Sequence, residues 1–244
     1  MFVKENRNID VKFDEKMDDP KVYKLWQEGK SFGIFQFESQ GMTNFMKELK
    51  PTCLEDIIAG VSMYRPGPMD SIPEFVRNKH NPDQITYVSP LLEPILNVTY
   101  GCMVYQEQVM KIVQVLAGYT LGRADSVRKM MGKKKLKDLQ KEREVFLNGC
   151  PAEGNKPAVD GAVKRGLDPD VCNKLWDEME KFGSYAFNKS HAACYAVVSY
   201  QTAYLKCHYP HQYMAALMTS VLDSAAKISG YIAECKEMGI PVLP

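Results

Sequence analysis

The chain has 244 residues, of which 45% are hydrophobic and 25% are charged, a composition typical of a globular protein with a substantial core. The net charge of +1 gives no overall sign of a polyanionic partner, so any basic surface has to be local. The longest apolar stretches, such as residues 192–198, are far shorter than the roughly 20 residues of a membrane helix. The N-terminus also lacks the apolar core of a secretory signal, so we expect a cytoplasmic protein without a membrane span.

The predicted elements are almost all helices, and punctuation by proline and glycine separates them. Asp19 before Pro20 predicts an N-cap followed by the first helical residue. Residues 31–37 alternate apolar with small or polar side chains, which predicts a short strand or an extended segment, and residues 66–68 predict a sharp turn. Helices are expected over residues 20–29, 38–49, 54–63, 73–79, 104–116, 124–131, 136–147, 169–182, 191–208 and 212–238.

The fold class that follows is mainly α, a multi-helix chain with a few short extended segments. Residues 149–166 are rich in glycine, proline, alanine and asparagine, which predicts a flexible connection. We therefore expect one subdomain over residues 1–150 and a second over residues 151–244.

The cysteines give no sign of a metal site or a disulfide framework. There are 7 of them, scattered along the chain and without a Cys-x-x-Cys pair. Cys207, His208 and His211 lie close together, but no fourth ligand is near, and they are interpreted as polar residues at a helix end. We expect no metal ligands among these residues.

The segment over residues 123–143 is strongly basic, although the chain as a whole is nearly neutral. It has nine basic residues against three acidic ones, a local net charge of +6. Its centre, residues 131–135, joins two predicted helices, so several ammonium groups could meet one anion or follow a phosphate backbone. The alternative is a solvated helix face, which would show a more even mixture of signs.

Residues 185–193 predict the start of a helix that attracts anions. Asn188 is placed to cap the helix, and Lys189, Ser190 and His191 would occupy its first turn. The free N–H groups of a helix N-terminus favour negative charge, and a lysine there is explained by an arriving phosphate. The alternative is a helix start whose lysine points to water.

Arg65 and the acidic residues complete the candidates. Arg65 precedes Pro66, which favours an extended backbone and a side chain that projects from a rigid corner, suited to holding phosphate. Glu38, Glu93 and Glu107 are isolated acids, and nothing groups them with aspartates as a two-metal site requires.

Eight motifs together resemble the fingers region of the bacterial C-family replicative DNA polymerases. They follow in the family's order and span nearly the whole chain, at residues 32–39, 64–69, 99–101, 104–110, 116–122, 131–134, 187–192 and 199–202. The longest read Phe-Gly-Ile-Phe-Gln-Phe-Glu-Ser, Val-Tyr-Gln-Glu-Gln-Val-Met and Phe-Asn-Lys-Ser-His-Ala. The resemblance implies a mostly helical region that closes on the incoming nucleotide and contacts the template.

The resemblance also assigns roles by position. Residues expected to bind the phosphates, base or sugar of the nucleotide are Arg65, Arg128, Lys133, Phe187, Asn188, Lys189, Ser190 and His191. Lysines expected to contact DNA are Lys79, Lys134, Lys135 and Lys137.

The function that the resemblance implies is part of a DNA-directed DNA polymerase of chromosome replication. Template-primer DNA and deoxynucleoside triphosphates would be its ligands. The catalytic aspartates and their magnesium would belong to a palm domain upstream, so this segment alone is expected to be inactive and to hold no cofactor. The sliding clamp, the clamp loader and a proofreading subunit would bind other regions of the parent. The alternative is a non-catalytic helical module that binds nucleic acid or protein through the basic segment.

Overall fold

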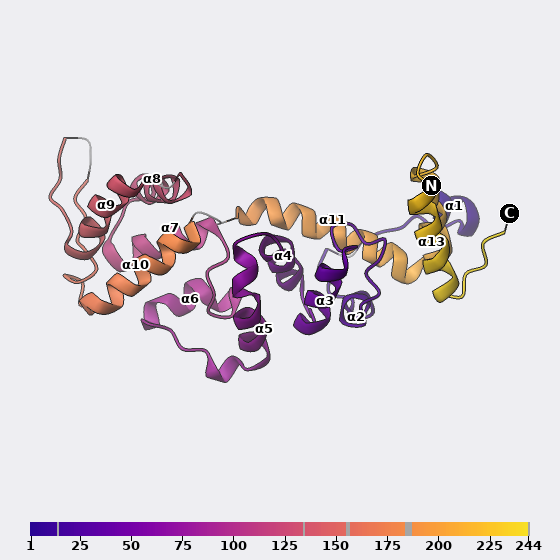
Figure 1. The fold of residues 1–244 in the computed structure, drawn as a ribbon, viewed down its shortest axis with the longest axis horizontal. Coiled ribbons are helices and arrows are strands. Elements are labelled where there is room, and N and C mark those ends of the chain that lie inside the picture. Colours follow the sequence, from indigo (N-terminus) through magenta and orange to yellow (C-terminus); the bar gives the residue numbers. More distant parts are fainter. Residues whose placement is uncertain (14, 134, 155–156, 184–186, 244) are drawn as a thin grey trace. The chain divides into compact units, whose positions relative to one another are not determined.

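The computed structural model describes residues 1–13, 15–133, 135–154, 157–183 and 187–243 (Figure 1). These residues form α-helices joined by turns and short 3₁₀ segments. Within this described part, pairing between extended backbones is limited to two isolated bridges, of Tyr105 with Phe187 and of Cys150 with Val159. The prediction of a mainly α fold with a few short extended segments is confirmed.

The helices group into two units by their internal contacts. The first unit comprises Met1–Val61 and Ala193–Pro244, and the second comprises Ser62–Ala192. The division therefore falls within two helices, and the boundary predicted at residues 150 and 151 lies inside the second unit.

The described parts of the glycine-rich segment near residue 150 are anchored to their surroundings. The N–H of Gly161 donates to the carbonyl of Ala117 at 3.1 Å. Gly149 has a φ of 77°, and a Cβ there would clash with the carbonyl oxygen of Asp160. The glycines thus allow two stretches of backbone to cross closely, which is a different use from the flexible connection that composition suggested.

The first unit contains five whole helices and parts of two others among its described residues. They are α1 (Phe2–Arg7), α2 (Pro20–Gln27), α3 (Gln40–Leu49), α4 (Leu54–Met63, which continues past the division), α12 (Pro210–Ser220), α13 (Ala225–Glu237) and the part of α11 (Lys189–His208) beyond Ala192. Asp19 accepts a hydrogen bond from the N–H of Lys21, and Pro20 is the first helical residue, as predicted. The tail expected to form one helical run is divided into α12 and α13 by a turn.

Residues 31–37 form two successive tight turns, so the prediction of a strand or extended segment is wrong. The N–H groups of Ile34 and Phe37 donate to the carbonyls of Ser31 and Ile34, each at 3.0 Å. Ile34 and Phe37 are both fully buried, whereas residues three positions apart on a strand would point to opposite faces. The ammonium group of Lys206 binds the carbonyl of Phe32 at 2.7 Å and fixes the turns.

The second unit is built on four longer helices and several short ones. Its elements are η1 (Pro68–Ser71), α5 (Ile72–His80), η2 (Pro82–Gln84), η3 (Pro90–Leu92), α6 (Glu93–Leu96), η4 (Asn97–Thr99), α7 (Gln106–Ala117), α8 (Leu121–Gly132), α9 (Leu136–Asn148), α10 (Pro169–Gly183) and the start of α11. The long helices match the predicted ranges to within a few residues. Their core contains Trp176 of α10 and Phe146 of α9, whose ring centroids are 5.2 Å apart.

The helices of the described residues can be compared with membrane-spanning helices in length and hydropathy. None of them combines the length and the apolar composition that crossing a lipid bilayer requires.

Candidate nucleotide and nucleic-acid interface

The centre of the candidate site is a short parallel β-bridge between two segments that are far apart in the sequence. Tyr105 pairs with Phe187, and the N–H of Gln106 donates to the carbonyl of Phe187 at 2.9 Å. The bridge joins two of the motifs found in the sequence, residues 104–110 and residues 187–192. We call residues 105–107 the α7 bracket, because α7 begins in it and it holds the second motif in place.

The α7 bracket is itself fixed by a buried glutamine. The Oε1 atom of Gln108 accepts the N–H groups of Val104 and Tyr105 at 2.8 and 2.9 Å. Its Nε2 group donates to the hydroxyl of Thr99 at 2.7 Å and to the carbonyl of Ile95 at 3.2 Å. Because each of these polar groups finds a partner, Gln108 can be buried without an unsatisfied hydrogen bond.

The start of α11 has the predicted cap, together with a partner that the sequence did not reveal. Asn188 Oδ1 accepts the N–H of His191 at 2.9 Å, and Lys189 is the first helical residue, so the predicted cap and first turn are confirmed. The N–H of Lys189 donates to both carboxylate oxygens of Glu107 at 3.2 Å, and the Nδ2 group of Asn188 donates to Glu107 at 3.0 Å. A carboxylate of the chain itself therefore occupies the helix end that was expected to attract a phosphate.

Glu107 is the functional candidate that sequence reasoning missed. From sequence it is an isolated acid, because its partners lie 81 and 82 positions away along the chain. A possible signal is its position at the start of a predicted helix, where an acidic residue is favoured and its carboxylate can also bridge to a second helix end.

Phe187 carries a cationic and an aromatic contact. The guanidinium of Arg65 lies over the ring, with its Cζ atom 4.1 Å from the ring centroid. The ring of His191 meets Phe187 edge to face, with centroids 5.3 Å apart. The Nε group of Arg65 also donates to the carbonyl of Ser62 at 2.9 Å, and burial lowers the pKa of the Arg65 guanidinium.

Arg128 and Lys189 both reach the α7 bracket directly. Arg128 donates from Nη1 to Gln106 Oε1 at 3.0 Å and from Nη2 to Asp125 at 2.7 Å. Lys129 pairs with the same aspartate, and Lys129 and Arg128 together hold the pKa of the Asp125 carboxyl below its usual value. The ammonium nitrogen of Lys189 lies 5.3 Å from the centroid of the Tyr105 ring.

Six of the predicted nucleotide-binding residues are thus connected through the α7 bracket or through Phe187: Arg65, Arg128, Phe187, Asn188, Lys189 and His191. Ser190 is exposed in the first turn of α11, and Lys133 is exposed at the end of α8.

The basic segment divides into paired arginines and exposed lysines. Arg123 forms a bidentate pair with Glu142, at 2.7 and 3.3 Å, and both side chains are mostly buried. Arg143 pairs with Asp177 of α10 at 2.6 Å. Both arginines therefore tie helices together, and the local charge of +6 overstates the charge that is open to a ligand.

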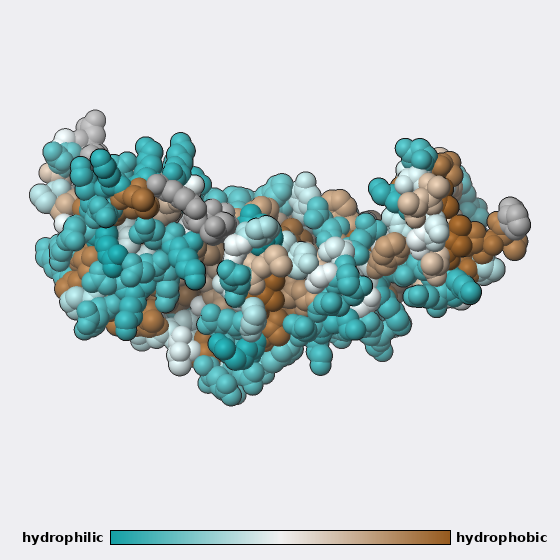
Figure 2. Space-filling model, in the orientation of Figure 1, coloured by the Kyte–Doolittle hydropathy of each residue, from teal (hydrophilic) through white to brown (hydrophobic). Residues whose placement is uncertain are grey.

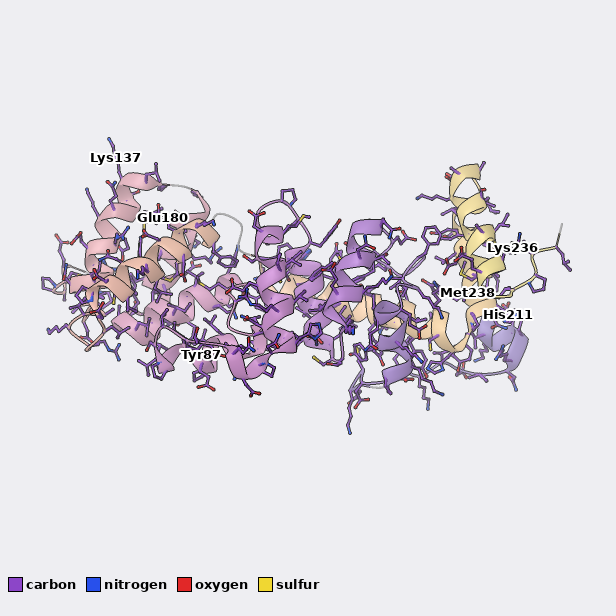
Figure 3. The ribbon with its side chains drawn as sticks, turned by 60° about the horizontal axis from the view of Figure 1, so that its bottom comes forward. Tyr87, Lys137, Glu180, His211, Lys236 and Met238 are labelled. Carbon is purple, nitrogen blue, oxygen red and sulfur yellow. The ribbon has the colours of Figure 1, made fainter. Side chains whose placement is uncertain are left out.

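The lysines of this segment are the part that remains accessible. Lys133, Lys137 and Lys141 are exposed, and within the described ranges no ion pair is recorded for them. Lys135 is also exposed and lies 3.9 Å from Asp138, whereas the predicted DNA contact Lys134 falls outside the described residues. Lys137 extends from α9 into solvent (Figure 3), and the surface in view over α8 and α9 is largely hydrophilic (Figure 2).

The predicted DNA contact Lys79 is found at the end of α5. Its ammonium nitrogen lies 3.4 Å from the hydroxyl of Tyr100 and 5.4 Å from the centroid of the same ring. These contacts place Lys79 against Tyr100, which precedes the α7 bracket in the chain.

Two of the hollows lined by described residues of the second unit contain charged side chains. One, of about 470 Å³, is bordered by Lys189, Glu107 and Lys111 and has apolar walls that include Leu91 and Ile95. The other, of about 600 Å³, contains Glu178, whose carboxyl pKa is raised by burial and then by Glu74 and Asp177. Among the residues with described positions, no three histidine, cysteine, aspartate or glutamate side chains come together to hold a metal ion.

The fold and the site together define a helical domain in which cationic and aromatic side chains converge on one backbone bridge. Residues 1–154 match the family of the bacterial DNA polymerase III alpha subunit finger domain. The chain belongs to this family. It spans about a fifth of the length of the curated relatives that it matches.

Three of those relatives illustrate the similarity. The DNA polymerase III subunit alpha of Thermus aquaticus is 46% identical over 249 residues, a match that covers 100% of this chain and 19% of that protein. The subunit of Aquifex aeolicus is 43% identical over 246 residues, covering 100% of this chain and 20% of the relative. The subunit of Escherichia coli is 44% identical over 235 residues, covering 93% and 19%.

Proposed function

We propose that this chain acts within a larger DNA polymerase, where the residues around the α7 bracket bind the incoming deoxynucleoside triphosphate. The observation that carries the proposal is the convergence of Arg128, Phe187 and Lys189 on residues 105–107. Two cations and an aromatic residue held by the same short stretch of backbone suit a ligand that has both phosphates and a base. Lys189 and Arg128 would meet the phosphates, and Phe187, Asn188 and His191 would contact the base and sugar.

Phosphoryl transfer depends mainly on positioning and on stabilising charge, and both can come from such residues. Magnesium would supply further charge stabilisation, but the described residues offer no fitting ligand set, so no step is assigned to it. The metal and the catalytic aspartates would belong to the rest of the parent protein. The regions that bind a sliding clamp, a clamp loader and a proofreading subunit would lie there too, and a cytoplasmic location is part of the same proposal.

Template-primer DNA would lie along the exposed lysines of α8 and α9. Lys133, Lys135 and Lys137 are accessible, and a flexible ammonium group contacts a phosphate backbone without reading sequence. Binding should therefore be weak and independent of sequence, with Lys79 and Lys134 as further candidates.

The chain assayed alone should extend no primer. On primed template with magnesium and all four nucleotides, extension by a clean preparation would contradict the assignment of catalysis to other parts of the parent. Adding the palm to the same chain should produce activity.

The nucleotide site is tested by Lys189→Ala in a polymerase that contains this segment. Loss of a charge-assisted contact should lower kcat/KM for nucleotide incorporation by roughly tenfold to a hundredfold. The fold should persist, because Lys189 is only half-buried in the first turn of α11. Lys174→Ala, which alters an exposed lysine of α10, is the matched control. Incorporation within twofold of the parent, at unchanged thermal stability, would show that Lys189 does not meet the triphosphate.

A further inference from the structure

Glu107 joins the N-terminal ends of two helices. It lies in the first turn of α7, and its carboxylate accepts hydrogen bonds from the first residue of α11 and from the capping residue before it. Each helix end carries partial positive charge, so one carboxylate between them is favoured by both. The N-terminal ends of α7 and α11 and the Lys189 side chain all bring positive charge to this place. The negative charge of Glu107 reduces the repulsion between them.

Glu107 binds the backbone N–H of Lys189 and the side chain of the capping residue Asn188. The ammonium group of Lys189 has a different neighbour. The backbone N–H of Lys189 is bound by both oxygens of the carboxylate. The ammonium nitrogen of the same residue lies against the Tyr105 ring, whose own position is set by the bridge to Phe187. Glu107 thus fixes the backbone of Lys189, and Tyr105 contacts the ammonium group at the end of its side chain.

We propose that Glu107 is a positioning residue for nucleotide incorporation. It holds the start of α11 so that the Lys189 side chain extends toward the triphosphate from a fixed backbone. The inference rests on the proposed function, because it requires that Lys189 meets the phosphates. It also implies that the N–H groups of Lys189 and His191 are already used at this helix end, which leaves side chains of the site to meet most of the phosphate charge.

Two other roles for Glu107 predict different behaviour. If the carboxylate were a placeholder that the triphosphate displaces, removing it would lower KM for the nucleotide. If it were a helix cap without functional consequence, its removal would lower stability, and its effect on kinetics would be independent of Lys189.

The experiment is a cycle of variants in the full polymerase that contains this segment: Glu107→Ala, Lys189→Ala and the double variant. We expect Glu107→Ala to lower kcat/KM by about fivefold, with most of the change in KM, because a misplaced lysine weakens nucleotide binding. In the Lys189→Ala background the same change should alter kcat/KM by less than twofold, since residues that act through one another are not additive. Glu107→Gln keeps one acceptor oxygen and the shape of the side chain, so it should recover part of the loss and provides a variant that folds if the alanine does not.

The outcomes separate the inference from the function on which it rests. A large effect of Lys189→Ala together with Glu107→Ala and Glu107→Gln both within twofold of the parent would overturn the role of Glu107 alone. Equal fold-losses from Glu107→Ala in the two backgrounds, or a lower KM, would overturn it as well. No effect of Lys189→Ala would overturn the proposed function, and the role of Glu107 with it.

Discussion

Each unit of the molecule uses one charged side chain to fix a segment of backbone, but the surroundings of that charge differ. In the first unit, the Lys206 side chain is only 1% exposed, and its ammonium group donates to the carbonyls of Lys30 and Phe32 at 2.9 and 2.7 Å. It also pairs with Glu234 at 2.6 Å. Burial lowers the pKa of the Lys206 amine, and the Glu234 carboxylate acts in the opposite direction.

In the second unit the corresponding charge is exposed. The Glu107 carboxylate accepts hydrogen bonds from Asn188 and Lys189 at the surface, where water can replace it. A buried charge without its partners has no such replacement. The comparison indicates that the charge in the first unit holds the fold, whereas the charge in the second mainly adjusts the position of site residues.

The largest effect is therefore expected from Lys206. Lys206→Ala leaves Glu234 without its partner in a mostly buried place and should lower the free energy of unfolding by about 3–5 kcal/mol. Lys236→Ala, on the exposed side of α13 (Figure 3), is the matched control and should stay within about 0.5 kcal/mol. Urea unfolding measures both, and equal stabilities would contradict the comparison.

Arg123 allows the same comparison within the second unit. Its bidentate pair with Glu142 is largely buried, so Arg123→Ala should lower the free energy of unfolding by roughly 2 kcal/mol. Lys137→Ala, only a short distance along the chain and exposed, should change it by less than about 0.5 kcal/mol. If thermal unfolding ranks the two variants the other way, the division of the basic segment into paired arginines and exposed lysines is wrong.

The smallest effects on stability, and the clearest on binding, should come from the exposed lysines. Replacing Lys133, Lys135 and Lys137 with alanine should reduce the slope of log affinity for duplex DNA against log salt by about 0.9 for each phosphate that a lysine no longer neutralises. Arg123→Ala should leave that slope unchanged, because its guanidinium is bound to Glu142. A slope that is the same in the triple variant and in the parent would mean that DNA binds to another surface.

The features that sequence predicted well depend on residues close together in the chain. Asp19 with Pro20 and the Asn188 cap were identified because a cap and its helix are neighbours in sequence. The helices themselves follow from apolar spacing within a few turns. The family motifs also identified Arg128 and Lys189 as candidates. They did not predict that both side chains converge on the α7 bracket.

What sequence could not predict depends on interactions between distant segments. Residues 31–37 adopt turns with the help of Lys206, 174 positions away from Phe32, so local alternation was a poor guide. Glu107 was dismissed because its partners lie in another motif. In the basic segment, a count of charges could not distinguish Arg143, paired with Asp177 on another helix, from an exposed lysine.

The most direct test of the central claim is the reactivity of Lys189 toward an amine-acylating reagent, measured by mass spectrometry in a full polymerase that contains this segment. If the α7 bracket presents Lys189 to the nucleotide, a correctly paired deoxynucleoside triphosphate on template-primer should slow its acylation severalfold. The exposed Lys174 of α10 should react at the same rate with and without nucleotide. Equal reactivity of Lys189 in both conditions, at nucleotide concentrations that saturate incorporation, would contradict the account.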